Sequence, residues 1–140
     1  MSATAMVELR PGTTGGRLAV GVAELTGLAP IRRFLDIPHL ERMHAAFEAV
    51  CRRALSRRDG AFVPHHDGES VVYVAPSVDD AIAIAQELIA RDQYNSGLLP
   101  VRVGVASGTV LLTQGRCYGP AVDLATLRMA AAPPGTVSAT

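Results

Sequence analysis

Three consecutive side chains of metal-ligand type, His65, His66 and Asp67, stand out in a chain with only four histidines. Imidazole and carboxylate groups are common ligands of zinc and other transition metals. Neighbouring side chains of an extended strand point to opposite sides, so His65 and His66 can share one ion only if the backbone turns. The alternative is a pair of solvent-exposed loop histidines, and we favour this second interpretation.

Arginine, cysteine and serine supply the other reactive groups. Four arginines crowd residues 52–58 and could form a phosphate patch, but we favour cations that complement the negative end of a helix. Cys51 and Cys117 lack a C-x-x-C pair, which argues against structural zinc, and both are expected to be packed. Ser107 lacks the G-x-S-x-G elbow of serine hydrolases. Without lysine, the chain cannot contain a P-loop motif.

The composition is that of one ordinary globular domain. Of its 140 residues, 49% are hydrophobic and 19% are charged, which suffices for a core and excludes global disorder. The 13 basic and 13 acidic residues give a net charge of zero, whereas nucleic-acid and anionic-membrane binders carry a basic excess. The first ten residues show no signal-peptide pattern, and polar residues interrupt the long apolar stretches. We therefore expect a cytoplasmic protein without nucleic-acid or membrane partners.

Hydrophobic periodicity predicts the elements that must position these groups. Residues 1–16, which end in a Pro- and Gly-rich string, are expected to be a flexible segment or a short leading strand before a domain over 17–140. Apolar residues three and four apart predict helices over 39–58, 77–92 and 122–132, and a turn with a short helix is expected within 25–36. Strands are predicted over 17–23, 62–63, 71–75, 98–105, 109–113 and from 135, with a turn at 64–68 and a hairpin bend at 106–108.

This order of elements, β-α-α-β-β-α-β-β-α-β, combines a βα unit with two hairpins. Such a mixture is typical of the α+β class, in which helices cover a mostly antiparallel sheet. We therefore predict an α+β sandwich with the helices on one face of the sheet.

Five segments, in the right order, resemble the motifs of class III nucleotidyl cyclases, the adenylate and guanylate cyclases. Residues 99–110 (LPVRVGVASGTV) are similar to the family's LPVRVGIHTGEVV, and residues 118–125 (YGPAVDLA) to its YFGPAVNLAARL. Residues 22–28, 68–74 and 132–135 are similar to FADIVGFT, GDGFLAVF and APPGQ. The resemblance implies the cyclase-homology fold, with its ferredoxin-like core, over nearly the whole chain, and a C-terminus shorter than that of the family.

The resemblance also implies candidate metal ligands. The family uses two Asp carboxylates to hold two Mg²⁺ or Mn²⁺ ions, which activate the ribose 3′-hydroxyl of ATP or GTP and neutralise the triphosphate. Both positions carry Glu here, at Glu24 and Glu69. Mg²⁺ requires near-ideal octahedral geometry at about 2.0–2.1 Å, so a side chain longer by one methylene argues against catalytic placement. The alternative is that both are surface acids at strand ends.

Other positions that the family uses to bind the nucleotide carry different residues here. The two base-selecting positions correspond to His65 and Arg116, and the ribose-orienting asparagine corresponds to Asp123. The arginine that stabilises the pentavalent phosphorus corresponds to Leu127. Arg128 follows directly but lies about 100° around the helix. An arginine of this kind is worth about 10³–10⁵ in rate, so its replacement argues against turnover.

These departures favour a degenerate cyclase homology domain, a pseudoenzyme that acts as a dimerising regulatory or binding module in bacterial signalling. The implied partner is a second copy, or another cyclase-type domain, on the sheet face that forms the family's nucleotide groove. One alternative is an active or weakly active adenylate cyclase that converts ATP to cAMP with Mg²⁺ or Mn²⁺. Another is a pocket that senses a nucleotide or other small ligand without turnover.

Overall fold

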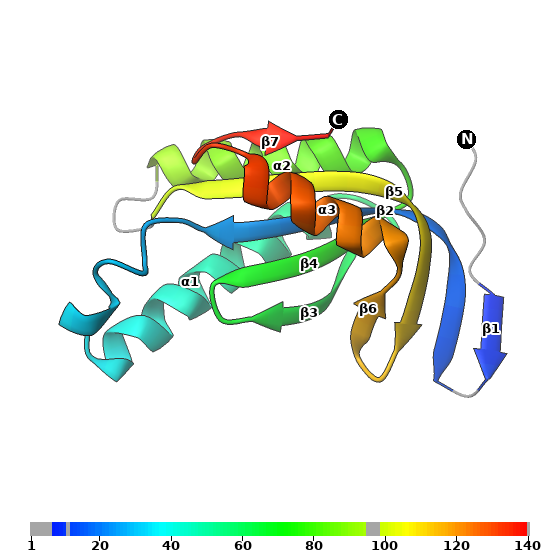
Figure 1. Cartoon of the computed structure of the whole chain (residues 1–140), viewed down its shortest axis with the longest axis horizontal. Helices are drawn as coiled ribbons and strands as arrows, with labels where there is room; N and C mark the ends of the chain where they lie inside the picture. Colours follow the sequence, from blue (N-terminus) through cyan, green and yellow to red (C-terminus); the bar gives the residue numbers. More distant parts are fainter. Residues whose placement is uncertain (1–6, 11, 95–98, 140) are drawn as a thin grey trace.

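The computed structural model describes residues 7–10, 12–94 and 99–139, and a seven-stranded sheet forms its centre (Figure 1). The strands are β1 (Val7–Arg10), β2 (Thr13–Leu25), β3 (Phe62–Asp67), β4 (Ser70–Ala75), β5 (Val101–Thr113), β6 (Arg116–Tyr118) and β7 (Val137–Ser138). Their order is β3-β4-β2-β5-β6, with β1 paired to β2 and β7 to β5. Only the β5–β7 pair is parallel among the strands described.

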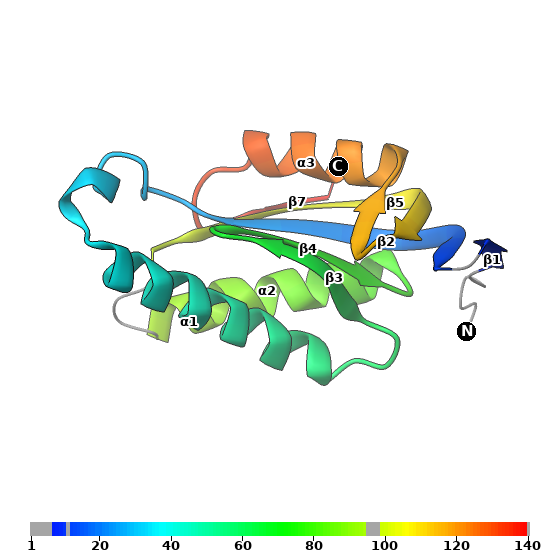
Figure 2. The same ribbon diagram turned by 90° about the horizontal axis from the view of Figure 1, so that it is seen from below.

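Helices cover both faces of this sheet. They are α1 (Ile37–Ser56), α2 (Val78–Tyr94) and α3 (Pro120–Ala131), with a 3₁₀ turn η1 (Arg32–Phe34) before α1. Figure 2 shows α1 and α2 on one side of the sheet and α3 on the other. The α+β class is thus confirmed, but the prediction that the helices share one face is wrong. Successive residues of β2 are apolar on both sides, so each face needs its own cover.

The alternation along β2 creates two cores. Ala19 and Ala23 belong to the core beneath α1 and α2, where Phe47 and Tyr73 are the largest side chains. Val20, with Leu18, Val22, Val72 and Val74, belongs to the core beneath α3. Within the described chain, no helix is long and apolar enough to cross a membrane.

Strand β5 is continuous, so the predicted hairpin bend at 106–108 is not formed. Ala106, Ser107 and Gly108 pair instead with residues 20, 19 and 18 of β2, and the two strands run antiparallel over 13 residues each. The chain reverses further on, at Gln114 and Gly115, which both have positive φ, and β6 returns along β5. The small and polar residues 106–108 are compatible with a bend. They stay extended because β2 is long enough to pair with them and so satisfies the hydrogen-bonding groups of their backbone.

The predicted turn at 64–68 is also shorter than expected. Residues 64–67 lie within β3, and the reversal into β4 uses only Gly68 and Glu69 between the paired residues Asp67 and Ser70. Gly68 has a φ of 60°, which suits a residue without Cβ. The register shifts between Phe62 and His65, around Pro64, which has no N–H for the ladder.

Two further boundaries differ from the predicted ones. Helix α1 begins at residue 37 because the Asp36 carboxylate caps it, accepting a hydrogen bond from the His39 amide at 2.8 Å. Strand β2 begins at Thr13, within the segment predicted to precede the domain, and β1 forms the short leading strand that was one of the alternatives.

Candidate functional site

The structure brings Glu24 and Glu69 together. Glu24 is near the end of β2 and pairs with Ser70 of β4, while Glu69 lies in the β3–β4 turn. The Leu25 amide donates to the Glu69 carbonyl at 2.8 Å, which fixes the two segments side by side. Both glutamates line a pocket of about 300 Å³ that also contains Arg102.

Glu24 is paired with an arginine on the neighbouring strand. Arg102 of β5 lies directly opposite Glu24, and its Nε and Nη2 donate to Oε1 of Glu24 at 3.2 and 2.8 Å. Its Nη1 donates to the carbonyl of Ala130 in α3 at 3.1 Å. Both side chains are about a quarter exposed, at 28% each. Arg102 therefore joins the carboxylate, the sheet and the last turn of α3.

Glu69 is paired with an arginine from the loop that leads to α1. Its Oε2 accepts a hydrogen bond from Nη2 of Arg32 in η1. Nε2 of His44 in α1 lies 4.0 Å from the same oxygen. Each of the two carboxylates thus already has a guanidinium counter-ion.

These side chains do not fit a pair of divalent cations. A hard cation takes six or more oxygen ligands, and the charged residues lining this pocket are two carboxylates and one arginine. Nowhere in the described parts of the chain do three or more His, Cys, Asp or Glu side chains form a group that could hold a metal ion. In addition, a guanidinium group already occupies one oxygen of each carboxylate, Oε1 of Glu24 and Oε2 of Glu69.

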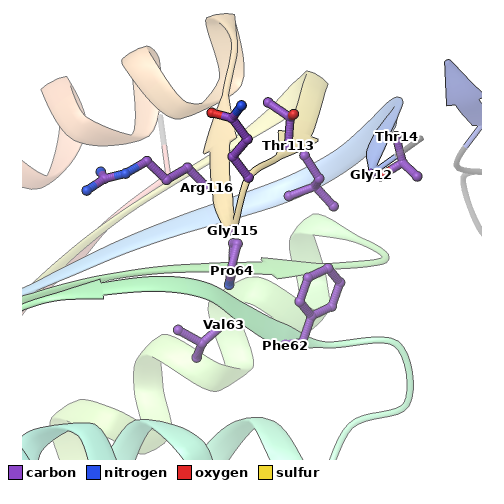
Figure 3. A pocket seen from close by; sticks show the side chains of 10 residues that line it. Gly12, Thr14, Phe62, Val63, Pro64, Thr113, Gly115 and Arg116 are labelled. Carbon is purple, nitrogen blue, oxygen red and sulfur yellow. The ribbon is translucent and has the colours of Figure 1, made fainter. Parts of the chain in front are cut away.

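The two base-selecting positions, His65 and Arg116, come close to each other but lie apart from this pocket. Burial, with a smaller contribution from the Arg116 charge, lowers the pKa of His65, and its Nδ1 is buried without a hydrogen-bond partner among the described residues. Figure 3 shows a second pocket, which Arg116 of β6 lines together with Val63 and Pro64 of β3. Its volume is about 340 Å³. The two pockets have no lining residue in common.

The neighbouring histidine belongs to the opposite face of the sheet. His66 packs against the ring of Phe47 in α1, and its Nδ1 lies 3.6 Å from Oε1 of Glu48. His65 and His66 therefore cannot share an ion, as expected for neighbours in a strand. The favoured interpretation as exposed loop histidines is wrong, because both are partly buried within β3.

Helix α3 carries the remaining predicted residues. Asp123 is exposed in its first turn, and Leu127 is 68% exposed. Arg128 turns toward the sheet, where its Nη1 donates to the Val105 carbonyl at 2.9 Å. The Arg128 guanidinium is thus already hydrogen-bonded to the sheet, whereas the Leu127 side chain is exposed to solvent. Arg128 therefore does not take the place of an arginine at position 127.

The arginines and cysteines singled out above have structural partners. Arg52, Arg57 and Arg58 form ion pairs with acidic residues of α1 and α2, which supports the helix-end interpretation over a phosphate patch. Cys51 and Cys117 are buried as predicted. Burial raises the pKa of Cys51 to about 12 and that of Cys117 to about 11, so both stay protonated at neutral pH.

Arg32 and Arg102 are the site residues that sequence reasoning missed. Arg102 lies in the quoted motif at 99–110, and its pairing with Glu24 would follow once β2 and β5 are known to be neighbours in this register. Arg32 has no comparable signal, since its position depends on the irregular segment between β2 and α1.

Curated relatives are similar to most of this chain. An adenylate cyclase from Streptomyces coelicolor is 32% identical over 121 residues, which are 86% of this chain and 32% of that protein. An adenylate cyclase from Glutamicibacter nicotianae is 33% identical over 120 residues, 85% of this chain and 29% of that protein. The chain thus spans about a third of the length of these relatives. No family model matches it.

Solved structures share the fold. The monomeric guanylyl cyclase domain of the RhoGC fusion protein from Blastocladiella emersonii superposes with a TM-score of 0.80 at 13% identity, covering 97% of this chain and 82% of that one. A dimeric form of that domain gives 0.75 at 15% identity, over 86% and 77%. The adenylate/guanylate cyclase/hydrolase from Silicibacter pomeroyi gives 0.76 at 18% identity, over 89% and 76%. This chain thus has the fold of adenylate and guanylate cyclase domains and is similar in sequence to adenylate cyclases.

Proposed function

We propose that this domain is a catalytically degenerate class III cyclase homology domain, which associates with a partner domain and does not convert a nucleotide. The observation that carries the proposal is the ion pairing of both candidate metal ligands, Glu24 with Arg102 and Glu69 with Arg32. A carboxylate that already has a guanidinium counter-ion is a poor ligand for a second cation, because the arginine charge repels the metal.

The residues of α3 support the same conclusion. Leu127 offers no positive charge at the position of the family's transition-state arginine, and Arg128 is bonded to the sheet. Asp123 adds a negative charge where the resemblance places the ribose and phosphates. Removing one donor aimed at transition-state charge costs about 2.7–4 kcal/mol, so these changes together reduce turnover to near background.

The exposed side of α3 supports association with a partner. Leu124 and Leu127 lie one turn apart and are 39% and 68% exposed, and Tyr118, just before the helix, is 46% exposed. Burying a large apolar side chain contributes about 1.5–3 kcal/mol, so this cluster favours contact with a second copy or another cyclase-type domain. The structural neighbours include both monomeric and dimeric cyclase domains.

A weakly active adenylate cyclase is the second candidate. Two observations favour it: the carboxylates of Glu24 and Glu69 line the same pocket, and relatives at 32% and 33% identity are named adenylate cyclase. In this candidate function, Glu24 and Glu69 would hold Mn²⁺ in place of their arginine partners, and the ion would neutralise the charge of the triphosphate.

A turnover assay separates the two candidates. The purified domain is incubated for hours with excess Mn²⁺ and either ATP or GTP, and cyclic product is measured by mass spectrometry. The proposed function requires product no higher than in the protein-free blank. Product that disappears in Glu24→Ala but persists in Glu41→Ala, a control on the exposed side of α1, would establish the enzyme instead.

A further inference from the structure

We propose that the start of β3, with the end of α1 on one side and the β5–β6 turn on the other, forms a groove that binds an extended acidic peptide with apolar residues at its centre. The groove consists of the pocket in Figure 3 and a further hollow next to it. Its lining residues belong neither to the Glu24–Glu69 pocket nor to α3, so this inference goes beyond the proposed function and does not depend on it.

The two hollows adjoin at the first residues of β3. The pocket of about 340 Å³ lies between β3 and the β5–β6 turn, and the further hollow, of about 250 Å³, is lined by Leu55 and other residues at the end of α1. Phe62 and Val63 line both, so the two hollows form one groove across the strand. Phe62 is 45% exposed, and covering its ring and the neighbouring apolar side chains is favourable. The groove therefore suits a partner with apolar groups on both sides of Phe62.

The backbone of β3 is also open to a partner. Strand β3 is at the end of the sheet and pairs with β4 alone among the described strands. Its register shifts between Phe62 and His65, so Val63 and Pro64 lie opposite the single residue Tyr73. An edge strand presents unpaired backbone groups, and a bulge leaves one further residue unpaired. An extended peptide can bond to such groups while its side chains enter the hollows.

The charge of the groove indicates what kind of peptide fits. Arg116 lines one hollow and Arg52 the other, and no carboxylate lines either. The Arg116 guanidinium has no hydrogen bond or ion pair within the described part of the chain. Nε and Nη2 of Arg52 donate to Glu48, but this arginine side chain is 63% exposed. Each hollow thus presents a cation, which favours acidic groups on either side of an apolar centre.

A second copy of the chain fits this groove less well than a peptide. Two copies would bring together Arg52 and Arg116 of both chains, and like charges repel each other across an interface. Pro64 has no N–H, so two β3 edges cannot form a regular ladder around it. A short peptide needs only a few backbone hydrogen bonds and carries the opposite charge.

Fluorescence polarisation with labelled synthetic peptides tests the proposal. The acidic set has two Asp or Glu residues at each end and Val, Leu, Ile or Phe between them. One matched set has Lys or Arg in place of the acidic residues, and another has Ser in place of the apolar ones. Circular dichroism establishes that each protein used is folded.

The test variants are Phe62→Ser and Arg116→Gln. Their matched controls are Phe34→Ser and Arg33→Gln, at an aromatic ring that is 74% exposed in η1 and at the arginine stacked on it, both outside the groove. Arg116 is exposed, so Arg116→Gln keeps the proposal testable if Phe62→Ser does not fold.

The expected result is saturable binding of peptides from the acidic set, at least tenfold tighter than that of the matched sets. Phe62→Ser and Arg116→Gln should each weaken this binding at least fivefold, and the two controls should leave it unchanged.

The proposal is overturned if no acidic peptide binds, if the basic set binds equally well, or if the controls lose as much affinity as the test variants. Single-stranded RNA that binds as tightly as the acidic peptides would also overturn it, because charge alone would then explain the binding. Self-association of the domain that Phe62→Ser abolishes would assign the groove to a second copy instead. Cyclic product in the turnover assay bears only on the proposed function.

Discussion

Arg102 and Glu24 face each other across the β2–β5 ladder, and two nitrogens of the guanidinium donate to one carboxylate oxygen, at 2.8 and 3.2 Å. Opposite-charge pairs across strands contribute about 0.2–1 kcal/mol. The third bond of Arg102, to the Ala130 carbonyl, extends this pair to α3. A single side chain thus connects the candidate metal ligand to the helix that carries Asp123 and Leu127.

Leu127→Asp is expected to weaken self-association of the domain at least tenfold. The substitution places a charge in the exposed apolar cluster of α3, and desolvating that charge in an interface is unfavourable. Sedimentation velocity over a concentration series measures the effect. Ile37→Asp is the matched control, because Ile37 is 70% exposed but begins α1 on the opposite face of the sheet. Equal association of both variants would contradict this assignment of the interface.

Arg116→Gln is expected to raise the pKa of His65. Burial and then the Arg116 charge lower this pKa from 6.5, so the substitution removes the second cause and leaves the first. The His65 Hε1 resonance, followed by NMR between pH 4 and 8, reports the change. Arg53→Gln, at an exposed position on α1, is the control that should leave the His65 titration unchanged.

The same group predicts how stability depends on pH. The pKa of His65 is lower in the folded state than the value of 6.5 expected for the unfolded chain. Just below pH 6.5, His65 is therefore protonated in the unfolded chain but still neutral in the folded one, and this difference favours unfolding. The contribution of neutral His65 is therefore present above pH 6.5 and is lost as the pH falls toward the folded pKa. Urea unfolding at several pH values should show a shallower acid decline in His65→Gln. An unchanged decline would contradict the assignment to His65.

Gly104→Ala is expected to destabilise the domain by about 3 kcal/mol, because α3 lies directly on this residue. A Cβ at position 104 would lie 2.1 Å from the Ala125 carbonyl oxygen and 2.2 Å from the Met129 amide nitrogen. Gly135→Ala is the comparison: its φ is 78°, but no atom lies within 4 Å of the added carbon, so about 1 kcal/mol is expected. Urea denaturation measures both, and equal losses would contradict the close approach of α3.

Both thiols are expected to react with Ellman's reagent at least about 100-fold more slowly in the folded protein than in guanidinium chloride. Raising the pKa of Cys117 from 9.0 to about 11 reduces its thiolate about 100-fold at pH 8, and burial limits access further. For Cys51 the pKa of about 12 makes the reduction larger. Cys51→Ala and Cys117→Ala assign each rate, and a thiol that reacts at the unfolded rate under native conditions would refute this prediction.

Sequence reasoning predicted what depends on local pattern. The apolar stripe through Met43, Phe47 and Val50 was sufficient to predict α1. The motif spacing singled out Glu24 and Glu69 as candidate ligands, and the two residues line one pocket. Local pattern failed where a distant partner decides the conformation. Residues 106–108 are extended only because β2 is long enough to pair with them, and His65 and His66 lie in β3 because β4 extends opposite them.

The charge balance of the site also depends on contacts between residues that are far apart in the sequence. Neither Arg102 nor Arg32 is near its glutamate in the sequence, and their pairing requires the strand register and the path of the loop before α1. The sequence was thus sufficient to predict the negative charges of Glu24 and Glu69. It was not sufficient to predict that Arg102 and Arg32 pair with them.

The two cores on opposite faces of the sheet are built from alternate residues of the same strands, such as Ala19 and Val20 of β2. Loss of either core would therefore remove the support of strands that the other core also needs. The domain should unfold as one cooperative unit, with the amide protons of central β2 and β5 exchanging only when the whole structure opens. Helix α3, which covers one face of the sheet by itself, is thus not an independent subdomain. A substitution that destabilises the core beneath α3 should also destabilise the core beneath α1.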